Sequence, residues 1–425
     1  MNKGWLPTAA VAAASMGLLI LLVLAVQGHQ PLAVSTPLGV MTALVGVAAF
    51  WFWVEQRTEW RIFAFLPPLL FIYATPIFLS NTGVLPFSSA AYDGLRAYGL
   101  PLFIALMLIK VDVAGAVRIM GKGVFVMLIG SVGVVVGAVA AYALLTGVGV
   151  LDADVWPAFG TLAGSWIGGT GNMNAAWAAL EGAPEHMTMA AIADVLVYIV
   201  WLPLLLGARE FAERFNRWAG VSHDRIERME QAAMAVDDAE RPPSMVQILY
   251  LALLALTTTA VSIWLAARLP ELALGGQVVV SESTWVILLV TTIALGLSTT
   301  RARDLPGAQP IAMAIIYVFV ASIGARANIA DTDLAQVGWF VAAAYLWIFI
   351  HGAFILAGAK FFRVDVHTLA IASAANIGGA ASAPVVAAHH RPALVPASIL
   401  MALIGYAVGN YLAILTGRLA QLIGG

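Results

Sequence analysis

Two apolar segments of this sequence are each interrupted by a pair of glycines. The first reads Gly164-Ser-Trp-Ile-Gly-Gly-Thr-Gly-Asn-Met-Asn174, within an apolar run from residue 156 to 180. The second reads Ser373-Ala-Ala-Asn-Ile-Gly-Gly-Ala-Ala-Ser-Ala-Pro384, within a run from 369 to 388. Each glycine costs a helix up to about 1 kcal/mol relative to alanine. In lipid, a broken backbone is tolerated only where protein or a water-filled cavity satisfies the freed polar groups, so each pair indicates a packed break or a site.

The composition is typical of a membrane protein. Of the 425 residues, 61% are hydrophobic and only 10% are charged, and the mean hydropathy is +0.92, whereas an average soluble protein is about 25% charged. Apolar segments of membrane-helix character recur along nearly the whole chain, which predicts an all-α polytopic membrane protein. The net charge of −2 gives no sign of a nucleic-acid partner. The absence of cysteine excludes disulfides and thiolate metal sites, and no cofactor is expected.

The apolar segments fall into two similar halves. An extra membrane helix is expected over residues 1–30, followed by one half over 37–207 and another over 245–417. A polar connector rich in Arg and Glu, residues 208–244, separates the halves. In each half a whole apolar segment precedes the glycine-interrupted segment and another follows it. We therefore expect two structural repeats.

The distribution of positive charge indicates how the chain crosses the membrane, because cytoplasmic loops carry an excess of Lys and Arg. If every apolar segment crossed, most of the 21 Lys and Arg residues would lie outside. If the two interrupted segments instead enter and return on the same side, only four lie outside: Arg96, Arg268, Arg326 and Arg418. This favours about 11 crossings plus two re-entrant segments. Because each half then has an odd number of crossings, the repeats are inverted. Broken helices that cross fully remain the alternative.

Inverted repeats whose interrupted helices meet near the midplane are typical of secondary transporters. A half-helix N-terminus attracts anions, and loosened carbonyls can coordinate a cation. We expect the polar groups beside the two breaks to bind the substrate: Ser165, Thr170, Asn172, Asn174, Ser373, Asn376 and Ser382. The alternative is that the Gly, Ser and Asn residues of these segments only permit close helix packing. For Gly164, Gly168 and Gly378, packing is at least as good an interpretation as contact with a ligand.

An acidic residue inside a membrane helix is by default a functional candidate. Asp194 lies within the apolar segment that follows the first break, and Asn410 lies in the corresponding segment after the second. We expect this pair to couple transport to Na⁺ or H⁺, the alternative being an interhelical hydrogen bond. His351 is also enclosed by apolar residues, and a structural hydrogen bond is the favoured reading for it. No metal is expected beyond a transported cation.

Five motifs resemble those of the YjcL-like integral membrane proteins, the family called domain of unknown function 819. They contain Tyr92-Asp93, Gly168-Gly169-Thr170-Gly171-Asn172, Ala193-Asp194, Gly378-Gly379 with Ser382-Ala383-Pro384, and Tyr406 with Gly409-Asn410. The family is similar to the cation:proton antiporter and anion transporter group. The resemblance implies transport, a homodimer, and an elevator movement of the domain that holds the interrupted helices.

The predicted function is that of a secondary active transporter, coupled to sodium or protons, for a small organic solute, either an anion or an amino acid. A channel, a non-transport membrane protein and a membrane-embedded enzyme are the alternatives. A channel needs a continuous polar path, whereas the polar groups here cluster at two breaks. No enzyme activity is expected, because the sequence lacks the His-Glu-x-x-His and Gly-x-Ser-x-Gly motifs. We expect a multi-pass protein of the inner (plasma) membrane with a cytoplasmic N-terminus.

Overall fold

The computed structural model describes residues 34, 36–58, 68–221, 242–274, 277–328, 333–391 and 394–424. Nearly all of this chain is helical, as predicted, and within the described residues seven helices are long and apolar enough to cross a membrane. The predicted N-terminal helix, residues 1–30, lies outside the described residues, as does most of the connector. Residues 208–219 of the connector are helical and form η4 (Ala208–Phe211) and α10 (Ala212–Ala219).

The chain packs as two compact units, each of which takes residues from both halves of the sequence. The first comprises residues 1–100, 183–188 and 313–333. Its hydrophobic core includes Leu44, Ile72, Tyr92 and Ala321. Its described elements are α2 (Pro37–Thr58), α3 (Pro68–Asn81), α4 (Ala90–Gly94), the π-helix η2 (Leu95–Gly99) and most of α14 (Ala308–Arg326).

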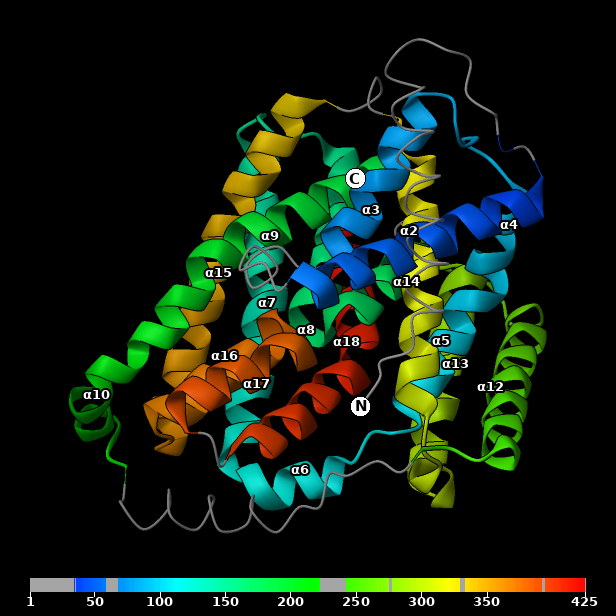
Figure 1. Ribbon diagram of the computed structural model, residues 1–425. Helices are drawn as coiled ribbons and strands as arrows, with labels where there is room; N and C mark the ends of the chain where they lie inside the picture. The colour runs from blue at the N-terminus through cyan, green and yellow to red at the C-terminus, as the bar shows by residue number, and fades with distance from the viewer. Residues whose placement is uncertain are drawn as a thin grey trace. The chain divides into compact units, whose positions relative to one another are not determined.

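The second unit contains both glycine-interrupted segments entire (Figure 1). Its helices before the connector are α5 (Leu100–Leu108), α6 (Val113–Met120), α7 (Lys122–Gly147), η3 (Ala153–Val155), α8 (Trp156–Ala179) and most of α9 (Pro184–Gly207). After the connector follow α12 (Met245–Ala266), α13 (Glu282–Ser298), η5 (Arg301–Asp304), α15 (Leu334–Phe362), α16 (Val366–Ile377), α17 (Gly379–His390) and α18 (Val395–Gly424).

The first interrupted segment folds back on itself at Gly169. This glycine has φ 74° and ψ −170°, a backbone conformation that is essentially confined to glycine. A Cβ on Gly164 would lie 2.5 Å from the carbonyl oxygen of Asn172, and Gly160 lies directly against Leu180. In a straight helix, residues 164 and 172 would be about 12 Å apart. The two arms of α8 therefore run antiparallel and form a hairpin, called hairpin one below.

The second interrupted segment is also a hairpin, called hairpin two, with its turn at Gly378 and Gly379. Gly379 has φ 57°, and the arms α16 and α17 lie side by side (Figure 1). At the open end, the Nδ1 atoms of His367 and His390 are 3.0 Å apart. The two turns meet, because a Cβ on Gly169 would lie 3.9 Å from the Cα of Gly379.

The prediction of a purely α-helical fold misses one small element. Between α12 and α13, the strands β1 (Leu272–Leu274) and β2 (Gln277–Val280) pair antiparallel. The sequence contains the signal, because two glycines separate a short apolar run from three consecutive valines. This β-hairpin cannot be recognised from hydrophobicity averaged over the length of a membrane helix, because its strands are only three and four residues long.

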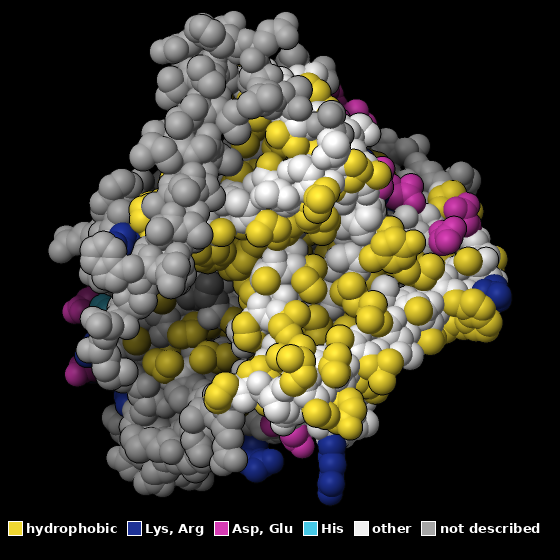
Figure 2. All heavy atoms as spheres, turned by 45° about the vertical axis from the view of Figure 1, so that its right-hand side comes forward, with side chains coloured by type: hydrophobic (Ala, Val, Ile, Leu, Met, Phe, Trp, Pro, Cys, Tyr) yellow, Lys and Arg dark blue, Asp and Glu magenta, His cyan; other side chains and the backbone are white. Residues whose placement is uncertain are grey.

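The surface agrees with a membrane environment. On the face drawn in Figure 2, hydrophobic side chains are spread over the described surface, and charged side chains lie toward its margins. Many of the exposed large side chains on the long helices are apolar, for example Leu253 on α12 and Phe349 on α15, at 62% and 57% exposure. Such faces are stable against lipid rather than water.

Candidate functional site

Helix α9 connects the two hairpins through side chains on one of its faces. Asp194, Tyr198 and Trp201 are spaced four and three residues apart, which places them on the same side of a helix. Asp194 bonds to the first arm of hairpin one. Tyr198 and Trp201 bond to the second and first arms of hairpin two. Hydrogen bonds from this one face therefore fix α9 against both interrupted segments.

The carboxylate of Asp194 has two donors, both from hairpin one. Ser165 donates through Oγ to Oδ2 at 2.7 Å, and Trp166 donates through Nε1 to Oδ1 at 2.9 Å. An indole N–H can only donate, so Oδ1 must remain an acceptor. A hydroxyl can donate or accept, so Oδ2 is the oxygen that can take up a proton, with Ser165 turning to accept. The same two oxygens, Oδ2 and Ser165 Oγ, are also ligands of the kind that a small cation prefers.

Two sets of side-chain hydrogen bonds join α9 to hairpin two. Tyr198 donates to Ser382 Oγ at 2.6 Å. His351 Nδ1 lies 2.9 Å from the carbonyl oxygen of Gly130, which can only accept, so Nδ1 carries the proton of a neutral ring. His351 Nε2 then accepts from Ser373 Oγ at 3.0 Å, and Ser373 accepts from Trp201 Nε1 at 3.0 Å. This arrangement agrees with the structural reading of His351.

Helix α18 packs along hairpin one through a stripe of small residues. Gly405, Gly409, Ala413 and Gly417 recur every four residues, and each contacts the hairpin. Gly405 lies against the carbonyl group of Ile167, and a Cβ on Gly409 would lie 2.5 Å from the amide nitrogen of Asn172. At the far end, Gly417 lies against Leu180. Small residues at this spacing let two helical backbones approach closely.

Asn172 and Asn410 are joined in a buried amide chain. Asn172 Nδ2 donates to Asn410 Oδ1 at 2.8 Å and to the carbonyl oxygen of Tyr406 at 3.0 Å. Asn410 Nδ2 donates to Thr291 Oγ1 on α13 at 2.7 Å. Asn172 and Asn410 are 5% and 2% exposed. The structure therefore brings Asp194 and Asn410 to opposite arms of hairpin one: Asp194 contacts the first arm, and Asn410 contacts the second.

Tyr406 lies at the meeting point of the two turns. Its ring is within reach of both glycine turns, because Cβ atoms on Gly169 and Gly379 would lie 3.2 and 3.4 Å from its Cε1. The backbone N–H of Ala380 donates to its hydroxyl oxygen at 3.3 Å. The N–H of Ala380, one of the first in the second arm of hairpin two, therefore already has an acceptor within the protein.

The remaining predicted site residues have different surroundings. Asn376 is fully buried and faces α7, where Nδ2 donates to Met127 O at 2.9 Å and Oδ1 accepts from Ser131 Oγ at 3.2 Å. Asn174 Nδ2 donates to Thr170 O at 2.7 Å, whereas its buried Oδ1 has no hydrogen-bond partner among the described residues. Thr170 is partly exposed beside the turn.

Sequence reasoning missed Trp166, Tyr198, Trp201 and Tyr406. A helical period counted from Asp194 points to Tyr198 and Trp201, and the same period counted back from Asn410 points to Tyr406. No helical period in the sequence points to Trp166, because its indole N–H reaches Asp194 only once hairpin one has folded.

These helices define a polytopic membrane protein with two helical hairpins in contact at their turns. The chain belongs to the family described as "Protein of unknown function (DUF819)", whose profile matches residues 42–422. The chain is 26% identical over 383 residues to the "Uncharacterized membrane protein YjcL" of Bacillus subtilis (strain 168), a match that covers 86% of this chain and 92% of that protein. The predicted family membership is confirmed.

Proposed function

We propose that the protein is a secondary active transporter that couples the movement of a small organic solute, an anion or an amino acid, to Na⁺ or H⁺. One observation carries this proposal: the two glycine-turned hairpins meet at their turns and are joined by α9. In transporters with inverted repeats, interrupted helices of the two repeats meet in this way near the bilayer midplane.

The exchange of contacts between the halves of the sequence supports inverted repeats over 37–207 and 245–417. Helix α9 follows hairpin one in sequence and bonds to hairpin two. Helix α18 follows hairpin two and packs along hairpin one. The two hairpins then enter the bilayer from opposite faces and return, about 11 crossings remain, and the N-terminus lies in the cytoplasm. The protein belongs to the plasma membrane.

Asp194 is the residue that we assign to ion coupling. It has one oxygen that can bind a proton or share a cation with Ser165, and its other oxygen is held by Trp166. Binding at this position changes the hydrogen bond to hairpin one. Since Tyr198, four residues later, holds hairpin two, the same helix can transmit the change to both hairpins. Asn172 and Asn410 hold the second arm of hairpin one during this change.

The division of the chain into two compact units supports an elevator-type movement. One unit holds both hairpins entire, together with α9 from Met189 onward and α18, and the other holds neither hairpin. An elevator carrier needs such a division, in which a transporting unit moves relative to a scaffold. The scaffold then forms a homodimer.

A ligand screen tests the proposed function on the purified full chain. Organic anions and amino acids are added with and without sodium, at pH 7.5 and pH 6, and the thermal unfolding midpoint is measured. A transported solute stabilises the folded state by mass action, and a coupling ion makes that stabilisation larger. The expected result is a solute whose shift depends on sodium or on pH. Stabilisation by a solute that is the same under all four conditions contradicts ion coupling.

A further inference from the structure

An apolar groove lies on the outer side of the pair α7 and α15. The two helices run antiparallel, since Gly137 contacts Trp347 near the middle of both helices, and Phe125, close to the start of α7, stacks on Phe362 at the end of α15. The groove is open to the surface and has a volume of about 410 Å³. It is lined by Ile129, Ala353, Phe354, Ala357, Gly358 and Phe361.

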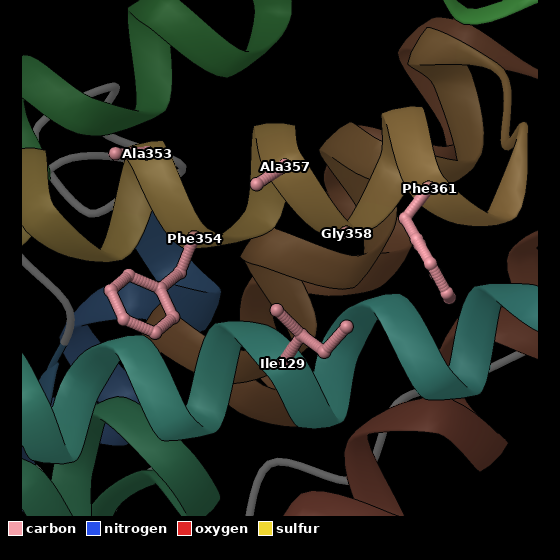
Figure 3. Close-up of a pocket in the computed structure, with 6 residues that line it drawn as sticks. All are labelled: Ile129, Ala353, Phe354, Ala357, Gly358 and Phe361. Carbon is pink, nitrogen blue, oxygen red and sulfur yellow. The ribbon is translucent and has the colours of Figure 1, made fainter.

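Small and large side chains alternate to shape the groove. Phe354 and Phe361 extend from α15 toward α7, and Ile129 extends from α7 into the space between them (Figure 3). Ala357 and Gly358 leave the α15 side open between the two phenylalanines (Figure 3). The phenylalanines are seven residues apart, which is about 10.5 Å along the helix. Every lining residue is apolar, so the groove suits a hydrocarbon chain, and its side chains provide no hydrogen-bonding group for a polar ligand.

Basic residues gather at one end of the groove. Lys122 begins α7, seven residues before Ile129, and Arg363 follows Phe361 by two residues. Both are exposed. Lys360 lies at the same end, where its ammonium donates to the carbonyl oxygen of Trp218 and lies 4.8 Å from the centre of that indole ring. The groove therefore leads from a hydrocarbon-lined space to a positively charged end.

Helix α10 and the preceding η4 place exposed aromatic and charged side chains at this end of the groove. Phe211, the last residue of η4, and Trp218 on α10 are 64% and 50% exposed, and Arg214 and Arg217 on α10 are also exposed. Aromatic rings and basic side chains together are typical of a helix that lies at the headgroup level. The exposed acids of this stretch are Glu210 in η4 and Glu213 in α10.

The third acid at this end already accepts hydrogen bonds from its own helix. Asp365 is buried, and its carboxylate accepts from the backbone N–H of His367 and from both the N–H and the hydroxyl of Thr368. It therefore caps α16 through neutral donors. Among the residues that the structure describes at this end of the groove, five bases (Lys122, Arg214, Arg217, Lys360 and Arg363) outnumber three acids (Glu210, Glu213 and Asp365).

We infer that this groove binds an anionic phospholipid, with an acyl chain between α7 and α15 and the phosphate headgroup at Lys122 and Arg363. Charge decides between lipids, because a zwitterionic headgroup gains little from two cations, whereas an anionic one gains from each. The assignment also fits the charge distribution along the sequence, which puts Lys122, Arg363 and the connector together on the cytoplasmic side.

Native mass spectrometry of the full chain tests this inference. Purified protein is offered equal amounts of palmitoyl-oleoyl phosphatidylglycerol and phosphatidylcholine. Wild-type protein is expected to retain phosphatidylglycerol in preference. The double variant Lys122→Gln/Arg363→Gln is expected to lose that preference, by about fivefold for each charge removed, with phosphatidylcholine unchanged.

Variants that fill the groove test the position of the chain. Ala357→Phe, or Ala353→Phe should the first fold poorly, is expected to reduce retention of both lipids, because both alanines are exposed and line the groove. Arg301→Gln and Ala342→Phe are the matched controls, since both residues are exposed and lie outside the groove. They are expected to behave as wild type.

Three results overturn the inference. Equal retention of the two lipids by wild-type protein removes the headgroup site. Unchanged retention in the groove variants removes the acyl-chain site. A dimer mass that disappears in Ala357→Phe while lipid retention stays constant makes the groove an interface with a second copy. None of these results depends on transport activity, so the lipid site can fail while the proposed function stands.

Discussion

Asp194 and Asn376 are both polar residues within apolar helices, but their hydrogen bonds leave them with different chemical capacities. The amide of Asn376 is bonded on both sides to α7 and cannot change its charge. Asp194 carries a carboxylate whose Oδ2 faces a hydroxyl that can donate or accept, and this is the oxygen at which we propose that a proton or a cation binds. Hydrogen bonding therefore distinguishes the proposed coupling residue, Asp194, from Asn376, whose amide is held by α7 and whose predicted contact with a substrate stays a prediction.

The histidine pair at the open end of hairpin two predicts a pH-dependent stability. Burial lowers the pKa of both His367 and His390. Asp365 partly opposes this, whereas Arg209 acts with burial on both rings, Arg391 on His367 and His389 on His390. An unfolded histidine titrates near 6.5, so below that pH the unfolded state binds more protons and the folded state loses stability. We expect the thermal midpoint to fall between pH 7.5 and 5.5.

The variant His390→Gln identifies the source of this pH dependence. It removes one titrating ring, so the fall in the thermal midpoint between the two pH values is expected to become smaller. His389→Gln is the control that leaves both buried rings in place; because His389 acts on His390 only as a neighbouring charge, it should change the fall less than His390→Gln does. A pH dependence that is the same in His390→Gln and in wild type would show that other groups cause it.

At the scale of helices, each hairpin is held by the helix that follows the other hairpin in sequence. Helix α9 holds hairpin two through the side chains of Tyr198 and Trp201. Helix α18 holds hairpin one through close backbone contact at its small residues. The first kind of contact is a few directional bonds that can be exchanged, and the second is a continuous packed surface.

Two glycine substitutions test the packed surface of α18. Gly409→Ala places a methyl group 2.5 Å from the amide nitrogen of Asn172 and should lower the stability by about 1–3 kcal/mol. Gly296→Ala on α13 is the matched control, since nothing lies within 4 Å of the added methyl group. It should be neutral or slightly stabilising. Thermal or denaturant unfolding in detergent measures both, and equal effects would contradict the close approach of α18 to hairpin one.

The sequence predicted the breaks in the two hairpins but not the partners of each arm. Gly-Gly pairs within apolar runs are local signals, and the turns at Gly169 and Gly379 follow from the low cost of positive φ in glycine. The bond between Tyr198 and Ser382 joins residues 184 positions apart. Such a partner depends on how whole helices pack, which no local pattern specifies. For the same reason Asn376 could be recognised as polar and buried, but not as facing α7.

At the scale of the whole molecule, the charge distribution predicts the orientation in the membrane. The chain has no cysteine, so a single introduced cysteine reports its own position. Pro242→Cys, in the exposed end of the connector, should react with an impermeant maleimide only after the cells are permeabilised. Asp152→Cys, before hairpin one, should react in intact cells. The reverse pattern would contradict a cytoplasmic connector.

Transport against a gradient tests the central claim most directly. The full chain is reconstituted in proteoliposomes with a solute found by the thermal screen, and an inward sodium or proton gradient is applied. A coupled carrier accumulates the solute above its outside concentration, and Asp194→Asn should abolish this accumulation while the protein remains inserted and folded. Solute that only equilibrates in wild type, or the same accumulation in Asp194→Asn, would contradict the account.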